Sequence, residues 1–169
     1  MRLTLIAPAL AAAALLAGAA QAAPAAGLHA ANLNGVDIAI PAGLPGQKTL
    51  LLLGFRHEDQ DALDAWRTGL GLAEDATGAA WLEIPVIPVK SSLIQPMIQG
   101  GMRKRFATPA LRAHVAPMFA DPGPVAAGFG VDPAQPAAVV VDRSGQVLAR
   151  AAGPYDGAKA APLLAALAP

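Results

Sequence analysis

The residue types best suited to acid–base or metal chemistry gather at one point of the chain, where His57, Glu58, Asp59 and Asp61 follow an apolar run. An imidazole beside carboxylates can exchange protons with a substrate, or can hold a hard or borderline cation weakly. A zinc site needs a further His or Cys ligand, and none lies nearby in the sequence. The alternative interpretation, which we favour, is a solvated first helical turn whose carboxylates complement the helix dipole.

Thiol chemistry is excluded by composition. The chain of 169 residues contains no cysteine. It therefore has no thiolate nucleophile, no redox couple and no soft metal ligand, so thiol–disulfide exchange and thiol peroxidase activity are impossible.

A basic segment is the second candidate for function. Between Val86 and Met118 the sequence has five basic residues and no acidic one. Methionines and a phenylalanine are interleaved with these charges, a composition that suits an adaptable protein partner or an anionic membrane. A solvated helix end is the alternative. The candidate partner-binding residues are Lys90, Met97, Met102, Arg103, Lys104, Arg105, Phe106 and Arg112.

Other catalytic and cofactor motifs are missing. The serines stand in no Gly-x-Ser-x-Gly context, and the glycines form neither a phosphate loop nor a dinucleotide fingerprint. We predict no cofactor and no metal. The formal net charge of zero argues against nucleic acid as a partner.

The N-terminal residues predict export. Residues 1–22 combine one positive charge at Arg2, an apolar stretch, and small residues on both sides of Gln21. This is the layout of a cleavable signal peptide, with retention as a membrane anchor as the alternative. We therefore expect a periplasmic protein, in which residues 23–31 form a loose leader and residues 32–169 form one domain. We expect a monomer or weak oligomer, which the membrane surface can recruit.

The hydrophobic pattern predicts an α/β fold with a mixed central sheet between helices. A short continuous apolar run at residues 50–53 suits a central strand that is buried on both faces. Strands are expected at residues 36–40, 48–55, 81–85, 137–142 and 146–152. Helices are expected at residues 58–72, 122–128 and 156–168, and a short helix followed by a strand is expected within residues 111–119. Residues 88–112 form a predicted helical insert, irregular or broken at Pro96 and Gly100–Gly101. Trp66 and Trp81 are expected in the core.

One local motif resembles the thioredoxin-like superfamily. In that superfamily a proline, usually after a cis peptide bond, precedes a strand that ends in Asp-x-x-Gly and a hairpin. Residues 136–147 have this form, so Gln135–Pro136 is the candidate for a cis bond. The resemblance implies a three-layer α/β/α sandwich with a redox site just after Phe55, where this chain has residues 56–60 and no cysteine.

Within that superfamily, three stretches are similar to the family of the mitochondrial F-type ATP synthase assembly factor that is tenth in its series, and to its bacterial relatives. The stretches are residues 83–88, 98–103 and 139–155. The resemblance implies a redox-inactive domain that helps to assemble the membrane sector of the ATP synthase. We therefore expect a binding or assembly protein whose partner is a membrane protein or an anionic membrane, acting through the insert and the Pro136 loop. The alternatives are an enzyme that uses His57, Glu58 and Asp59, and a small-ligand-binding domain.

Overall fold

The structure, a computed structural model, describes residues 27–72 and 78–168. The signal peptide predicted for residues 1–22 lies outside the described residues, as do residues 23–26 of the expected leader. In chain order the elements are β1 (Leu28–Ala31), β2 (Asp37–Ile40), β3 (Lys48–Gly54), η1 (His57–Asp59), α1 (Gln60–Gly69), β4 (Trp81–Pro85), α2 (Gln95–Arg105), α3 (Pro109–Ala113), α4 (Pro122–Phe129), β5 (Ala137–Asp142), β6 (Val147–Ala152) and α5 (Gly157–Leu167).

The strand β3 lies inside a four-stranded mixed sheet of order β4-β3-β5-β6. β4 runs parallel to β3, with Leu51 opposite Leu82, and β5 runs antiparallel to it, with Leu51 opposite Val139. The four leucines at residues 50–53 are fully buried, as their consecutive apolar pattern predicts for a strand covered on both faces. The expected strand end near Pro85 and the expected hairpin of β5 and β6 are confirmed.

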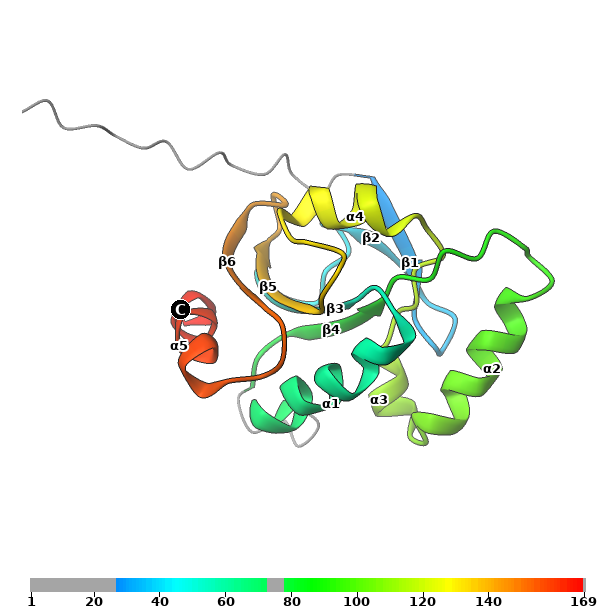
Figure 1. Cartoon of the computed structure of the whole chain (residues 1–169), viewed down its shortest axis with the longest axis horizontal. Helices are drawn as coiled ribbons and strands as arrows, with labels where there is room; N and C mark the ends of the chain where they lie inside the picture. Colours follow the sequence, from blue (N-terminus) through cyan, green and yellow to red (C-terminus); the bar gives the residue numbers. More distant parts are fainter. Residues whose placement is uncertain (1–26, 73–77, 169) are drawn as a thin grey trace, which may run out of the picture.

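Two apolar cores lie on the two faces of this sheet. Leu51 packs into a core that contains Phe129 of α4 and residues of β1 and β2. Leu52 packs into the other core with Trp66 of α1, Trp81 and residues of α5. Figure 1 shows α4 and α1 on opposite sides of the strands, so the three-layer α/β/α arrangement is confirmed. Both tryptophans are buried, as expected.

The expected loose leader is wrong for its described part. Residues Leu28–Ala31 form β1, which pairs antiparallel with β2 and sets Leu28 opposite Ile40. Ala30 is buried against the same core as Ile38 and Ile40. Alanine has a weak strand propensity, so the alanine-rich composition concealed a strand that is fixed by pairing and burial.

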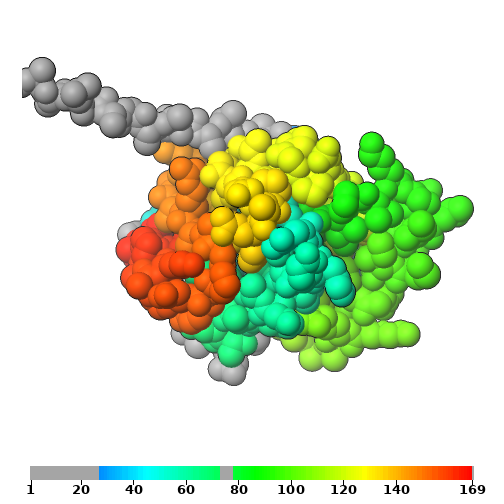
Figure 2. Space-filling view, viewed as in Figure 1, coloured from blue at the N-terminus to red at the C-terminus, as the bar shows by residue number. Residues whose placement is uncertain are grey.

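The insert contains two helices, α2 and α3, and α2 is one unbroken helix instead of the irregular helix expected. Pro96 stands in the first helical turn, where its missing N–H removes no hydrogen bond, and Gly100 and Gly101 lower helix propensity without interrupting the helix. α2 buries none of its residues. Figures 1 and 2 show it projecting beside the start of α1, at the right of both views.

After α3 the chain returns along the sheet and extends it beyond β4. Val115 bridges Glu83 in parallel, and Met118 bridges Val86 in the same direction. The expected short helix followed by a strand is therefore a helix followed by isolated bridges. Among the described residues, every helix is too short or too polar to cross a membrane.

The expected cis bond at Gln135–Pro136 is wrong. That bond is trans, and Ile40–Pro41 is the cis peptide bond of the described chain. Trans is the lower-energy isomer of an X-Pro bond. In this conformation the carbonyl oxygen of Pro136 accepts a hydrogen bond from Gly153 N, at 2.8 Å, which continues the hairpin pairing.

The packing of Tyr155 on α1 gives a test of the fold. Tyr155 donates its hydroxyl to the carbonyl oxygen of Gly69 and meets Trp66 edge to face at 5.1 Å. A methyl group on Gly69 would lie 2.4 Å from the Tyr155 ring. We expect Gly69→Ala to lower the free energy of unfolding by about 1 to 3 kcal/mol through overpacking, measured by urea denaturation.

The matched control is Gly100→Ala in α2, because a methyl group there meets nothing within 4 Å. It should raise the free energy of unfolding by about 0.5 to 1 kcal/mol, the ordinary effect of replacing a helical glycine by alanine. Equal effects at the two positions would contradict this account of Tyr155.

Candidate functional site

The segment after Phe55, where the resemblance places a redox site, is built around Asp59. The carboxylate of Asp59 accepts hydrogen bonds from Phe55 N at 2.9 Å and from Arg56 N at 3.0 Å. Its second oxygen accepts a hydrogen bond from the Arg56 guanidinium at 2.8 Å. Asp59 is only 2% exposed. It therefore serves to turn the chain from β3 into η1 and is not free for proton transfer or metal binding.

The two neighbours of Asp59 in the predicted acid–base cluster point outward. His57 and Glu58 are both exposed, and Glu58 approaches the Arg56 Nε at 4.0 Å. Across residues 27–72 and 78–168, no three His, Asp or Glu side chains are grouped so that they could hold a metal ion. His57, Glu58 and Asp59 are neighbours in the sequence, but the structure does not bring their side chains together into one site.

A cavity of about 580 Å³ opens beside this segment. It lies at the carboxyl ends of the parallel strands β3 and β4, between the start of α1 and the inner side of α2. Open α/β sheets bind ligands at this end of their strands. The cavity is lined by Gly54, Phe55, Arg56, His57, Gln60, Leu63, Pro85, Val86, Ile87, Pro88, Ile98, Gly101, Met102 and Arg105.

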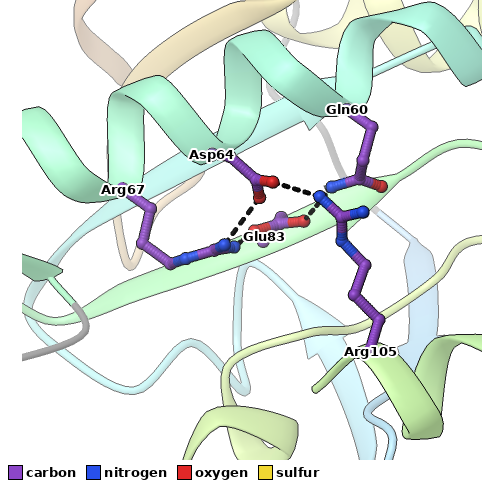
Figure 3. Close-up of polar contacts among 5 residues, drawn as sticks. All are labelled: Gln60, Asp64, Arg67, Glu83 and Arg105. Atoms are coloured by element: carbon purple, nitrogen blue, oxygen red, sulfur yellow. Dashed lines mark hydrogen bonds and ion pairs between the residues drawn. The ribbon is translucent and has the colours of Figure 1, made fainter.

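A polar network that starts at the buried Glu83 connects β4, α1 and the insert (Figure 3). Glu83 of β4 has no exposed surface, and its carboxylate accepts hydrogen bonds from Arg67 at 2.7 Å and from Gln60 at 3.2 Å. Arg67 also bonds Asp64 at 2.6 Å. The second oxygen of Asp64 pairs with Arg105 of α2. One chain of charges therefore runs from the sheet to the insert.

The surroundings of Glu83 act on the pKa of its carboxyl in opposite directions. Burial raises the pKa of the Glu83 carboxyl above its ordinary range, and Asp64 acts in the same direction. Arg67 and Gln60 oppose that rise in the pKa, because both stabilise the ionised form. Sequence reasoning missed this residue, since it appeared only as a polar position inside an apolar strand.

Much of the predicted basic surface is used to hold the insert in place. Arg103 donates to the carbonyl oxygen of Leu33 at 2.8 Å, and Arg112 donates to that of Phe106 at 2.8 Å. Phe106 is buried, with the Arg67 guanidinium 5.3 Å from its ring centre. Arginines that satisfy backbone carbonyls in this way are structural groups, so they contribute little to a free surface.

The remaining predicted surface residues are accessible. Lys90 and Lys104 are exposed, and neither forms an ion pair within the described part of the chain. Met97 is 72% exposed, whereas Met102 is half-buried and lines the cavity. The structure therefore divides the eight predicted residues into a group that anchors the insert and a group that faces solvent.

The loop of Gln135 and Pro136 does not join this site. Gln135 is exposed and Pro136 is buried, and neither lines the cavity. Of the predicted active surface, the insert borders the cavity and the Pro136 loop does not.

Sequence comparisons and structure comparisons differ in outcome. A scan against protein-family models and a search of curated proteins give no match to this sequence. Solved structures do match. The exposed lipoprotein thioredoxin Etrx1 of Streptococcus pneumoniae superposes with a TM-score of 0.56 at 13% identity, over 81% of this chain and 96% of its own.

Two further matches cover nearly all of their own chains. A thioredoxin-family thiol:disulfide interchange protein from Chlorobium tepidum gives a TM-score of 0.53 at 19% identity, over 88% of this chain and 99% of its own. StoA from Bacillus subtilis gives 0.53 at 17% identity, over 85% of this chain and 98% of its own. The fold is thioredoxin-like. The predicted link to the ATP synthase assembly factor stays a prediction.

The thioredoxin-like fold here lacks the residues of thiol chemistry. Proteins named as thioredoxins or thiol:disulfide interchange proteins are among its structural neighbours, yet this chain contains no cysteine. Its segment after β3 uses Arg56 and Asp59 to shape the turn instead. The fold is therefore shared, and the chemistry printed in the neighbours' names does not follow from it.

Glu83 predicts a pH dependence of stability. Its folded pKa lies above the unfolded value of about 4.3, so the native state binds the proton more tightly and Glu83 stabilises the fold most below that value. The stabilisation is lost as the pH rises through the folded pKa. In urea denaturation from pH 7 down to pH 4, the unfolding free energy of the native chain relative to Glu83→Gln should rise, by about 1.4 kcal/mol per unit of pKa difference.

A control of opposite sign is Asp142→Asn. The Ser144 hydroxyl lowers the pKa of Asp142, so this carboxylate stabilises the fold above its unfolded pKa of about 3.9 and loses that effect as the pH falls. Relative to Asp142→Asn, the native chain should become less stable toward pH 3. The same slope in both comparisons would show that Glu83 is not responsible.

Proposed function

We propose that this chain is an exported, redox-inactive binding protein that docks a membrane-protein partner through its insert and assists the assembly of a membrane complex. In this proposal it is not an enzyme. The observation that carries the proposal is the insert patch, which we define as Leu93, Ile94 and Met97 at the start of α2. These side chains are 87%, 43% and 72% exposed.

The insert patch is unusual within this molecule. Six large hydrophobic side chains are exposed in the described part of the chain, and the three of the insert patch lie within residues 93–97. Single exposed apolar residues are normal, but a contiguous group marks an interaction site. Methionine adds an adaptable, polarizable side chain to such a surface.

The charges near the patch favour a membrane-side partner. Lys90 precedes the patch and Lys104 follows it on α2, and both are exposed. Lysines near an anionic bilayer contribute about 1 kcal/mol each to attraction. The partner we propose is a membrane protein whose exposed segment meets the insert patch while these lysines face the membrane surface.

Sequence patterns support the proposed location and the proposed partner. Residues 1–22 support export to the periplasm, and residues 83–88, 98–103 and 139–155 are similar to the ATP synthase assembly factor. We therefore propose the membrane sector of an F-type ATP synthase as the first partner to test, with a monomer or weak oligomer as the acting form.

The enzyme alternative receives no support from the geometry. Asp59 is occupied by two backbone N–H groups and Arg56, and His57 makes no hydrogen bond or ion pair to a carboxylate within the described residues. An acid–base pair needs its members within hydrogen-bond reach of one another or of a shared substrate.

The first experiment compares two double variants, each of which replaces two exposed apolar side chains by serine. Leu93→Ser with Met97→Ser should lower in-cell crosslinking to ATP synthase membrane subunits about tenfold, because apolar anchors dominate interface free energy. The matched control is Leu148→Ser with Leu164→Ser, which removes two exposed leucines from β6 and α5. Equal crosslinking by both double variants would overturn the proposed surface.

A second experiment tests the lysines. Lys90→Glu with Lys104→Glu should weaken sedimentation with anionic vesicles at least about thirtyfold while the free energy of unfolding changes by less than about 0.5 kcal/mol. Arg103 and Arg105 are poor choices for charge reversal, because both hold the insert to the domain. Unchanged vesicle binding would remove the membrane from the proposal and leave the protein partner.

A further inference from the structure

We propose that the cavity beside η1 binds a long-chain carboxylate, with the alkyl chain inside the cavity and the carboxylate at its mouth. At about 580 Å³ the cavity has the size of a small-molecule site, and such sites combine mostly apolar walls with a few placed polar groups. This inference is independent of the proposed docking function, since the residues of the insert patch do not line the cavity.

Three elements supply apolar walls. Phe55 and Val86 come from the ends of β3 and β4, Leu63 comes from α1, and Ile98 and Met102 come from α2. Phe55 and Val86 are buried, and Ile98 and Met102 are half-buried. An alkyl chain placed among these side chains is removed from water along the part that they line. Its burial contributes about 0.8 kcal/mol for each methylene group.

The backbone at the cavity favours an alkyl chain over a peptide. A bound peptide would need hydrogen-bond partners for its own amide groups, and burying them unpaired is costly. Four backbone N–H groups of lining residues are already bonded within the chain. The bonds run from Phe55 N and Arg56 N to Asp59, from Val86 N to Gly54 O, and from Ile87 N to Met118 O. An alkyl chain needs none of them.

The mouth of the cavity offers donors for a carboxylate. Arg56, His57 and Arg105 are the ionisable lining residues, and the lining contains no Asp or Glu. The arginine side chains are 45% and 46% exposed. Each guanidinium carries five N–H donors, and the bonds from Arg56 to Asp59 and from Arg105 to Asp64 leave several of them for a ligand.

The nearby buried carboxylates do not compete for that position. Asp59 and Glu83 are buried and accept bonds from the chain, and Asp64 is shared between Arg67 and Arg105. Glu58 and Asp132 also act on the charge of Arg56, but Glu58 comes no nearer to Arg56 Nε than 4.0 Å, beyond hydrogen-bond distance, so N–H donors of the two mouth arginines stay open to a ligand. A ligand with an anionic end therefore fits this mouth better than a neutral or cationic one.

Titration calorimetry on the purified full-length chain tests the ligand class with three probes. The two ionic probes are used below their critical micelle concentrations, and dodecanol is used below its solubility limit. Dodecanoate should bind one site in the micromolar range. Dodecanol should bind about tenfold more weakly and dodecyltrimethylammonium more weakly still, because they lack the anionic end. Arg56→Gln should weaken dodecanoate but not dodecanol. Equal affinities for all three probes, or no dodecanoate binding at about 1 mM, would overturn the proposal.

A matched pair of variants tests the place of binding. Gly101 lines the cavity and Gly100 does not, and at both positions a Cβ atom would meet nothing within 4 Å, which leaves room for a larger side chain to begin. Gly101→Phe should fill the cavity and lower dodecanoate affinity at least about tenfold, while Gly100→Phe should leave it unchanged. Circular dichroism checks that both variants fold. Equal affinity in the two variants would show that the ligand binds elsewhere.

Discussion

A carboxylate with no exposed surface, Glu83, stands in the middle of β4, and a charge in that position must be paired by its neighbours or lost to protonation. Arg67 and Gln60 of α1 supply the partners, which fixes how α1 lies across the sheet. Asp64 then neutralises the other side of Arg67 and reaches Arg105. The buried carboxylate of Glu83 is thus connected through Arg67 and Asp64 to the insert, which forms one wall of the cavity.

The turn at Asp59 explains how this thioredoxin-like fold keeps an open site without cysteine. The turn after β3 is stabilised by the Asp59 carboxylate bound to backbone N–H groups, so no disulfide or metal is needed to shape it. The space beside the turn is bordered by apolar side chains and bounded by a helix that attaches mainly through charged groups. Binding, which requires a shaped and accessible surface, is the kind of function such a site supports.

Some features followed from the sequence because they depend on local pattern. The apolar run at residues 50–53 indicated a strand covered on both faces, and Asp142 with Gly145 indicated the turn of the β5–β6 hairpin. The helical spacing of Leu63 and Trp66 placed both in the core. In each case the signal that predicts the structure lies within a few neighbouring residues, although distant contacts complete the packing.

Other features depend on pairing between distant residues and could not be read from the chain. β1 is a strand because β2 pairs with it, and its alanines give no signal of their own. Glu83 and Arg67 are 16 residues apart, and Arg103 meets Leu33 across 70 residues. The arginines of the insert therefore looked free in the sequence while the fold uses them as anchors. The insert patch and cavity became visible only when burial was known.

Because α2 buries none of its residues, its place on the domain depends on a few attachments. Its C-terminal end is fixed by Phe106 packed under Arg67, whereas its first turn carries the exposed side chain of Met97, and exposed Leu93 lies just before the helix. The link between Arg105 and Asp64 is partly open to solvent, so dissolved salt screens it far more than the apolar contacts of the sheet. Salt therefore weakens this one attachment of α2 selectively, while the bond from Arg103 to Leu33 and the packing of Phe106, which depend less on charge, keep the insert on the domain.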